Sequence, residues 1–488
     1  MKNRGWRMTY PIFLYTKSKI TLVKKKQFFM KNRILSIDAF VFITFLVFQY
    51  FNAIVFSQDL DFLSPEIYAR RRSAVLAQLP DSSVAVFHSA KVKIRSNDIE
   101  YEYHQANNLY YLTGITDHNT VLVLVKEGIE TDSTMTEEIL FVPKPRHFIK
   151  YFEGPYITVE EAKNELGFEV VKTYDMFNNE LENFLKGRKI LFYSFQTEFL
   201  HNQISDKRYF LGPYAKETIK EKFPELEVKS PRKILSSLRQ IKSPEELQLM
   251  RKAIDITCVA HIEAMRSAKP GMYEYQLEAI IEYIFKWAGA EYSAFPSTVG
   301  SGPNSTILHY WKNRRKMQAG DVVVMDIGAE YHSYAADVTR TIPVSGKFTK
   351  EQQEIYEIVL RAQKDAMAAI KPGVRFRDIH KVAQKVITDA GYGKYFIHST
   401  SHYVGLDVHD VGDYGLLQPG MVITVEPGIY IREGAEADKA YWNIGVRIED
   451  DVLITPDGYK ILSDKAPREI AEIETLMKQD SKVSFNLE

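Results

Sequence analysis

Two stretches of the chain share one order of residues, and this repeat constrains the fold more than any other feature. Residues 264–289 and 366–391 each read Ala-Met, then Lys-Pro-Gly, then Ala-Gly, at matched spacing. Each copy leads into a region that carries histidine, His309 after the first copy and His402 with His409 after the second. We therefore predict an internal duplication whose two pseudo-symmetric halves enclose a cleft. Clefts at such interfaces commonly bind ligands.

The rest of the pattern predicts an α+β protein of two domains. At 488 residues the chain is too long for one ordinary core. Residues 58–235 are predicted to form a smaller α/β domain, because helical stretches alternate with apolar runs typical of buried strands. These runs lie at 82–87, 120–125, 138–142 and 189–193. Residues 236–470 are predicted to form the second domain, where Ser-Pro-Glu-Glu at 243–246 has the form of a helix-starting capping box. Residues 471–488 are predicted to form a tail.

Composition excludes several classes of function. Basic and acidic residues each number 63, so no basic excess indicates nucleic acid as a partner. A small polar molecule or a peptide is the substrate expected by default. Cys258 is the only cysteine, which excludes an intrachain disulfide and a thiolate metal cluster. Its helical pattern predicts a core position, with a catalytic thiol as the alternative.

The first 57 residues differ from the rest of the chain. A basic stretch at 1–33 precedes an apolar run at 34–56 and a polar exit at Ser57-Gln58, the order of zones in an export signal. We predict export to the periplasm or the outside, with a mature protein that starts near Gln58. The alternative is an uncleaved membrane anchor, because the run approaches spanning length. Met30 would give a conventional leader, so it competes with Met1 as the true start.

Two aspartates lie on neighbouring apolar strands. Asp326 belongs to the run 322–328 and Asp337 to the run 335–341. A hairpin centred near Tyr331-His332 would put the two carboxylates directly opposite each other. Opposed like charges destabilise a hairpin unless a cation lies between them. The alternative is that both are exposed residues beside a turn.

Further polar residues strengthen the hypothesis of a metal site. Glu426 ends one apolar strand and Glu449 lies within another, and glutamate is rarely buried without a partner. Arg447 is an available ion-pair partner for Glu449, which is the alternative for that residue. Three histidines, His398, His402 and His409, lie within one short span. Together with the acidic strands they favour a dinuclear metal site.

At these residues the sequence resembles the pita-bread metallopeptidases, and within them the Xaa-Pro aminopeptidases (aminopeptidase P). The resemblance is strong over about residues 236–466, and residues 109–114 resemble the creatinase-like N-terminal domain of that family. A single motif is modest support, whereas all of them in this order are highly specific. The matching stretches are 298–302, 307–310, 325–329, 336–340, 401–412, 426–430 and 446–450.

The resemblance implies a role for each site residue. The implied metal ligands are Asp326, Asp337, His402, Glu426 and Glu449. Within this set Asp337 and Glu449 bridge two divalent ions and His402 completes the shell of one. The implied substrate-side residues are His309, His398 and His409, with support from Tyr430 and Arg447. An oxygen-rich shell with one imidazole suits Mn²⁺ and permits Co²⁺, Fe²⁺ or Zn²⁺.

The implied activity is hydrolysis of the bond between the first residue of a peptide and a proline at the second position. Two ions can hold a hydroxide between them and polarise the scissile carbonyl, while Glu426 moves the proton. Histidines can stabilise the oxyanion. The alternatives are a prolidase, which accepts only Xaa-Pro dipeptides, and a metal-free or creatinase-like relative, which would lack the carboxylates. The family also makes a homo-oligomer an expectation.

Overall fold

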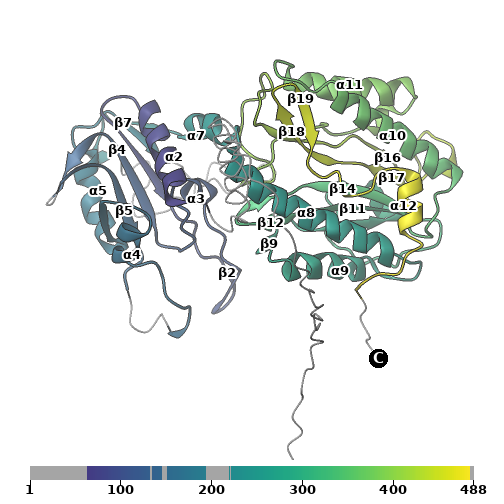
Figure 1. Cartoon of the computed structure of the whole chain (residues 1–488), viewed down its shortest axis with the longest axis horizontal. Coiled ribbons are helices and arrows are strands. Elements are labelled where there is room, and N and C mark those ends of the chain that lie inside the picture. Colours follow the sequence, from purple (N-terminus) through teal and green to yellow (C-terminus); the bar gives the residue numbers. More distant parts are fainter. Residues whose placement is uncertain (1–62, 132–133, 146–150, 194–218, 220, 484–488) are drawn as a thin grey trace, which may run out of the picture. The chain divides into compact units, whose positions relative to one another are not determined.

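The computed structural model describes residues 63–131, 134–145, 151–193, 219 and 221–483 (Figure 1). The predicted leader, residues 1–57, and the last five residues of the predicted tail lie outside these ranges. Within the described residues no helix is both long and apolar enough to cross a bilayer. Leu60–Glu488 form one compact unit.

The first part of this unit is built on a six-stranded mixed sheet. Side chains of β1 (Ser83–His88) alternate between the two faces, with Ala85 and Phe87 in one apolar cluster and Val84 and Val86 in another. All four predicted strands are confirmed. The sheet order is β6 (Val170–Thr173), β5 (Met135–Val142), β4 (Val121–Glu130), β1, β7 (Ile190–Tyr193) and β8 (Glu227–Lys229). A small hairpin joins β2 (Ile94–Ser96) and β3 (Ile99–Glu100).

Helices cover both faces of this sheet, which makes it the predicted α/β arrangement (Figure 1). One face packs against α2 and α3, whose residues share an apolar cluster with Ala85 and Phe87, and the other packs against α5. The helices of this part are α2 (Pro65–Gln78), α3 (Asn107–Thr113), α4 (Val159–Asn164) and α5 (Phe177–Leu185). The next helix, α7 (Arg232–Arg239), spans the predicted domain division at Ser236.

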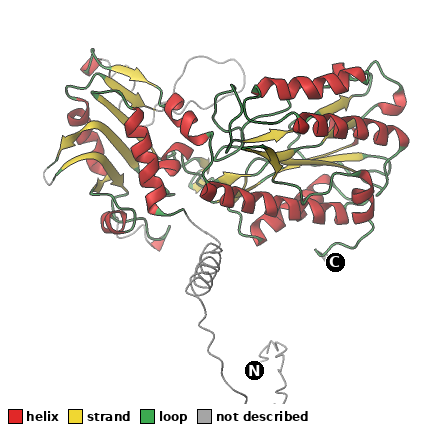
Figure 2. Cartoon of the chain, turned by 45° about the horizontal axis from the view of Figure 1, so that its top comes forward, coloured by secondary structure: helices red, strands yellow, loops and turns green. Residues whose placement is uncertain are grey.

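The second part contains two pairs of antiparallel helices with strands between them (Figure 2). The first pair is α8 (Pro244–Ser267) with α9 (Glu274–Trp287), and the second is α10 (Lys350–Ala368) with α11 (Phe376–Asp389). The capping box predicted for α8 is present, because the Ser243 hydroxyl accepts from the Glu246 amide. Cys258 is fully buried in α8, so the prediction of a core position is confirmed.

Each helix pair accompanies a three-stranded antiparallel sheet. The first sheet is β10 (Thr298–Ser301), β11 (Val322–Ile327) and β14 (Val338–Pro343), and the second is β15 (Val422–Val425), β18 (Asp450–Thr455) and β19 (Gly458–Ile461). Shorter strands flank them, namely β9 (Tyr292–Ser293), β12 (Ala329–Tyr331), β13 (Tyr334–Ala335), β16 (Gly428–Ile431) and β17 (Ile444–Arg447). The helix α12 (Ile470–Leu476) ends the described fold.

The predicted duplication is visible in individual hydrogen bonds. The amide of Gly271 donates to the carbonyl of Met317 at 2.8 Å, and the amide of Gly373 donates to the carbonyl of Leu417 at 2.9 Å. Both glycines need the left-handed conformation, with φ of 93° and 85°. The repeated Lys-Pro-Gly motif therefore makes the same turn in both halves and confirms the pseudo-two-fold fold.

The hairpin that carries Asp326 and Asp337 has a different register from the predicted one. In the pairing of β11 with β14, Asp326 lies opposite Thr339, so the prediction that it faces Asp337 directly is wrong. Asp337 precedes Thr339 by two residues, and side chains two apart along a strand share a face. The two carboxylates therefore still lie on one side of the hairpin, as diagonal neighbours.

The position of the turn explains the shift. Tyr331 pairs with Tyr334, so the chain reverses at His332 and Ser333, one residue later than predicted. Both turn residues have positive φ, 47° and 63°. Two consecutive left-handed residues make the tight turn whose twist matches a hairpin. Neither residue is a glycine or an asparagine, so the sequence does not mark this turn.

Gly328 lies where this hairpin is most closely packed. A Cβ at this position would lie 1.8 Å from the carbonyl oxygen of Ala336. We expect Gly328→Ala to lower the free energy of unfolding by about 2–3 kcal/mol, the usual scale of overpacking. Divalent-ion content should fall as well, because the substitution displaces the strands of Asp326 and Asp337.

Denaturation curves and metal analysis measure both effects. Gly458→Ala in β19 is the matched control, because no atom would lie within 4 Å of its new Cβ. Equal stability and equal ion content of the two variants would contradict the expected role of Gly328.

Candidate metal centre

Four carboxylates meet because equivalent strands of the two halves deliver them. Asp326 lies near the end of β11, and Glu426 directly follows β15 in the other half. Asp337 directly precedes β14, and Glu449 directly precedes β18. Since β11 pairs with β14 and β15 pairs with β18, each half supplies one carboxylate from each strand of a pair. The duplication thus accounts for the pairwise origin of these four carboxylates.

The one imidazole among the predicted ligands, that of His402, lies at a position where the two halves differ. The carbonyl oxygen of His402 accepts from the amide of Thr424 in β15 at 2.9 Å, and the His402 amide donates to the Thr424 hydroxyl at 3.1 Å. His402 thus lies beside β15 as Gly300 in β10 lies beside Val324 of β11. The first half has no room for a side chain at this place, because a Cβ on Gly300 would lie 2.7 Å from the Asn304 carbonyl oxygen. Only the second half can therefore present an imidazole here.

The donor atoms lie at distances that suit a shared cation. His402 Nε2 is 3.3 Å from Asp337 Oδ2 and 3.5 Å from Glu426 Oε1. Three donor atoms, one each from Asp337, His402 and Glu449, lie within 4.8 Å of one another. All of the predicted ligands except Asp326 are connected by these distances. Asp326 is instead paired with Arg447, whose Nη2 lies 2.6 Å from Asp326 Oδ2.

Asp326 carries the clearest sign of a missing partner. Its Oδ2 accepts a hydrogen bond from Arg447 Nη2 at 2.6 Å, whereas its Oδ1 is buried and has no hydrogen-bond partner among the described residues. A buried charged oxygen without a partner is costly. A divalent cation with oxygen ligands fits this atom and the carboxylates around it.

The electrostatics of the metal-free site lead to the same conclusion. Burial and the neighbouring carboxylates raise the pKa of Asp337 and of Glu449 well above their usual ranges. Burial raises the pKa of Glu426 to about 7. Each of these carboxylates makes ionisation of the others less favourable. A divalent cation among them would remove this free-energy cost of ionisation.

Arg447 organises the rim of the cluster. Besides Asp326, its guanidinium donates to Tyr430 Oη at 2.9 Å and to Thr339 Oγ1 at 3.1 Å. Tyr430 Oη in turn lies 2.9 Å from His398 Nε2. Arg447, Tyr430 and His398 therefore form one connected chain of hydrogen bonds. Burial, with Arg447 nearby, lowers the pKa of His398 to about 4, so its imidazole is neutral at pH 7.

His409 and His309 lie on the open side of the cluster. The ring of His409 is 4.2 Å from that of His402 between centroids. Desolvation lowers the pKa of His409 to about 4, and the nearby His402 and His309 add to the shift. The structure thus brings all ten predicted site residues to one place.

Asp451 and Thr339 also belong to the site, and the sequence analysis did not identify them. Asp451 Oδ2 accepts from the amide of Asp337 at 3.0 Å, and burial raises the Asp451 pKa to about 7. Thr339 Oγ1 donates to Glu449 Oε2 at 2.6 Å. A run of acidic residues, 449–451, inside an apolar strand was the signal available for Asp451. Thr339 could be assigned to the site only from the register of the hairpin.

Two protein families match the chain. Residues 248–456, which include every site residue above, match metallopeptidase family M24, and residues 68–193 match the aminopeptidase P N-terminal domain. The chain is 35% identical over 438 residues to the Xaa-Pro aminopeptidase of Escherichia coli, covering 85% of this chain and 98% of that protein. The Xaa-Pro dipeptidase of Pyrococcus furiosus is 42% identical over 259 residues, but these cover 52% of this chain and 71% of that protein.

A solved structure shows the same fold. Aminopeptidase P from Escherichia coli with the inhibitor Pro-Leu superposes with a TM-score of 0.76 at 34% identity. The match covers 85% of this chain and 98% of that chain. It therefore includes both the six-stranded part and the duplicated part.

The raised pKa of Glu426 predicts how the stability of the metal-free protein changes with pH. Its pKa is about 7 in the folded chain and 4.5 ordinarily, so the folded state favours the protonated form. This contribution to stability is present below pH 4.5 and is lost as the pH rises through 7. Metal-free wild type and Glu426→Gln should therefore melt at nearly the same temperature at about pH 4, with the variant a few degrees higher at about pH 8.

Melting curves in chelator at both pH values measure this difference. Glu426→Gln has nearly the same shape as the wild type, so the buried histidines titrate alike in both proteins and do not contribute to the difference in melting temperature. The exposed Glu433→Gln serves as the control substitution. A variant that melts below the wild type at pH 8 would contradict the buried-carboxylate description.

Proposed function

The chain belongs to the aminopeptidase P branch of metallopeptidase family M24, and we propose that two divalent ions in its site support removal of the first residue from peptides with proline at the second position. One observation carries the proposal. Carboxylates from both halves of the duplication meet around His402, and Asp326 Oδ1 is buried with no hydrogen-bond partner in the part of the chain that the structure describes.

Five side chains would hold the ions, namely Asp326, Asp337, His402, Glu426 and Glu449. When bound, two such ions lower the pKa of water and polarise a carbonyl oxygen. Mn²⁺ is the first choice for this oxygen-rich donor set. The side chains that surround it then handle the proton and the substrate.

Glu426 is the residue suited to move the proton. It lies 3.5 Å from both His402 Nε2 and His398 Nδ1, and burial raises its pKa to about 7, which suits a group that must accept and return a proton near neutral pH. In the proposed mechanism its carboxylate accepts a proton from the attacking water and delivers it to the departing proline nitrogen. That nitrogen needs a proton because it leaves as a secondary amine.

The neutral imidazoles are suited to the substrate carbonyl. An Xaa-Pro bond has no amide hydrogen, so recognition depends on the carbonyl and on the shape of the ring. His409 can donate to the carbonyl oxygen and stabilise the charge that develops there. His309 faces His409 closely enough to affect its pKa, and we assign it to seating the proline. His398 is held by Tyr430 and Arg447 on the remaining side.

A prolidase is the nearest alternative, and the comparisons do not favour it. The dipeptidase of Pyrococcus furiosus matches only half of this chain, whereas the Escherichia coli aminopeptidase matches 85% of it. A metal-free or creatinase-like protein is disfavoured because every implied carboxylate is present at the site. A homo-oligomer remains a prediction from the family resemblance.

A peptide panel tests the proposed activity. We expect turnover of Xaa-Pro-Leu with Mn²⁺, at least about a hundredfold slower turnover of Xaa-Ala-Leu, and loss of turnover after exhaustive chelation, because the side chains alone do not supply the activated water. The Xaa-Pro dipeptide separates the two candidate enzymes. Turnover of the dipeptide but not of the tripeptide would identify a prolidase, and full turnover without metal would contradict both.

The order of basic, apolar and polar zones in residues 1–58 supports export as a further part of the proposal. We expect N-terminal sequencing of protein from its native host to begin near Gln58. Recovery of residues 34–56 in a membrane fraction would instead indicate an anchor.

A further inference from the structure

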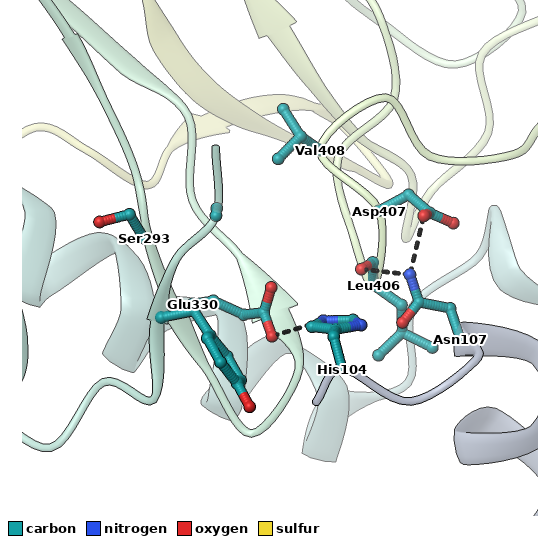
Figure 3. Close-up of a pocket in the computed structure, with 9 residues that line it drawn as sticks. His104, Asn107, Ser293, Glu330, Leu406, Asp407 and Val408 are labelled. Atoms are coloured by element: carbon teal, nitrogen blue, oxygen red, sulfur yellow. Dashed lines mark hydrogen bonds and ion pairs between the residues drawn. The ribbon is translucent and has the colours of Figure 1, made fainter. Parts of the chain in front are cut away.

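A short segment before and within α3 reaches the loop that carries His409 (Figure 3). Asn107, the first residue of α3, donates from Nδ2 to the carbonyl oxygen of Leu406 at 2.9 Å and to Asp407 Oδ1 at 2.7 Å. Three residues earlier, His104 Nε2 lies 2.8 Å from Glu330 Oε1 on β12. The segment is therefore attached both to this loop and to the hairpin that delivers Asp326 and Asp337.

The two ends of the loop are fixed by other contacts. The carbonyl oxygen of Gly405 accepts from the amide of Ala335 at 2.8 Å. At the other end Asp410 is buried and forms ion pairs with Arg239 and, at 3.1 Å, with Lys242. Between these ends Asp407 is the anchored side chain, held by Arg239 at 2.6 Å and by Asn107.

His409 depends on this anchoring for its place. Its imidazole makes no hydrogen bond to any of the described residues, so the loop backbone decides where the ring lies against His402. Packing holds the loop only in part: Leu406 and Val408 contact an apolar cluster, but together with Asp407 they also line a pocket of about 300 Å³ (Figure 3). A loop with free space beside it needs directional bonds to hold one position.

We propose that Asn107 is a positioning residue for His409. Its amide ties the Leu406 carbonyl and the Asp407 carboxylate to α3, and this sets the distance between the His409 ring and the substrate carbonyl. Small misplacement of a donor is enough to lower turnover steeply. The inference rests on the proposed function of His409. It assigns an indirect contribution to the six-stranded part of the chain, which carries none of the predicted metal ligands.

A double-mutant cycle on metal-loaded protein tests this role. We expect His409→Ala to lower kcat/KM on an Xaa-Pro tripeptide by roughly a hundredfold, the scale of a lost oxyanion donor. Asn107→Ala should lower kcat by roughly tenfold, with KM changed by less than about twofold. In the His409→Ala background, Asn107→Ala should have less than about a twofold further effect, because the two residues act through one interaction.

Two further variants complete the design. Asn107→Asp keeps the shape of the side chain but removes the donor and faces Asp407 with a like charge, so its kcat should fall at least as far as that of Asn107→Ala. Asn164→Ala, an exposed asparagine on α4, is the matched control and should keep wild-type kinetics. Metal content and melting temperature are measured for every variant.

The outcomes separate this inference from the proposed function. An inactive wild type would contradict the proposed function itself. An active wild type with unchanged kcat in both Asn107 variants would overturn the positioning role. A tenfold loss that persists in the His409→Ala background would also overturn it, since Asn107 would then act on something other than His409.

Discussion

The repulsion among four carboxylates, two buried and two mostly buried, is the constraint on which the rest of this structure depends. Asp337 and Glu449 are 5% and 2% exposed, and Glu426 and Asp326 lie beside them. Bringing such groups out of water costs several kcal/mol for each charge unless an opposite charge compensates. Arg447 compensates one carboxylate directly, through Asp326. The proposed pair of divalent ions would compensate the remaining charges and would supply the chemistry of the site.

The duplicated fold makes this arrangement possible without long loops. Equivalent strands deliver equivalent carboxylates, so two copies of one simple unit build a site that neither copy could build alone. The useful differences lie where the copies diverge. Gly300 leaves room for the main chain near Asn304, whereas the equivalent His402 contributes the imidazole. The His409 loop belongs to the second copy and is held from outside the duplication by Asn107.

Much of this could be predicted from the sequence because the signals are local. The repeated Lys-Pro-Gly motif, the capping box at Ser243 and the strand-borne acidic residues each reflect nearby residues, and all of them correspond to features of the structure. The hairpin register could not be predicted, since the turn at His332 and Ser333 uses left-handed residues without a glycine or asparagine to mark it. The contact of Asn107 with Asp407 joins residues 300 positions apart, so no local pattern could reveal it.

The most direct measurement of the central claim is a calorimetric titration of the metal-free protein with Mn²⁺ at pH 7, repeated in two buffers of different ionisation enthalpy. Two ions should bind per chain, and binding should release protons, because the carboxylates with raised pKa values hold protons until the ions arrive. Binding of a single ion would contradict a dinuclear centre. Binding of two ions without proton release would contradict the claim that the buried carboxylates repel one another until cations join them.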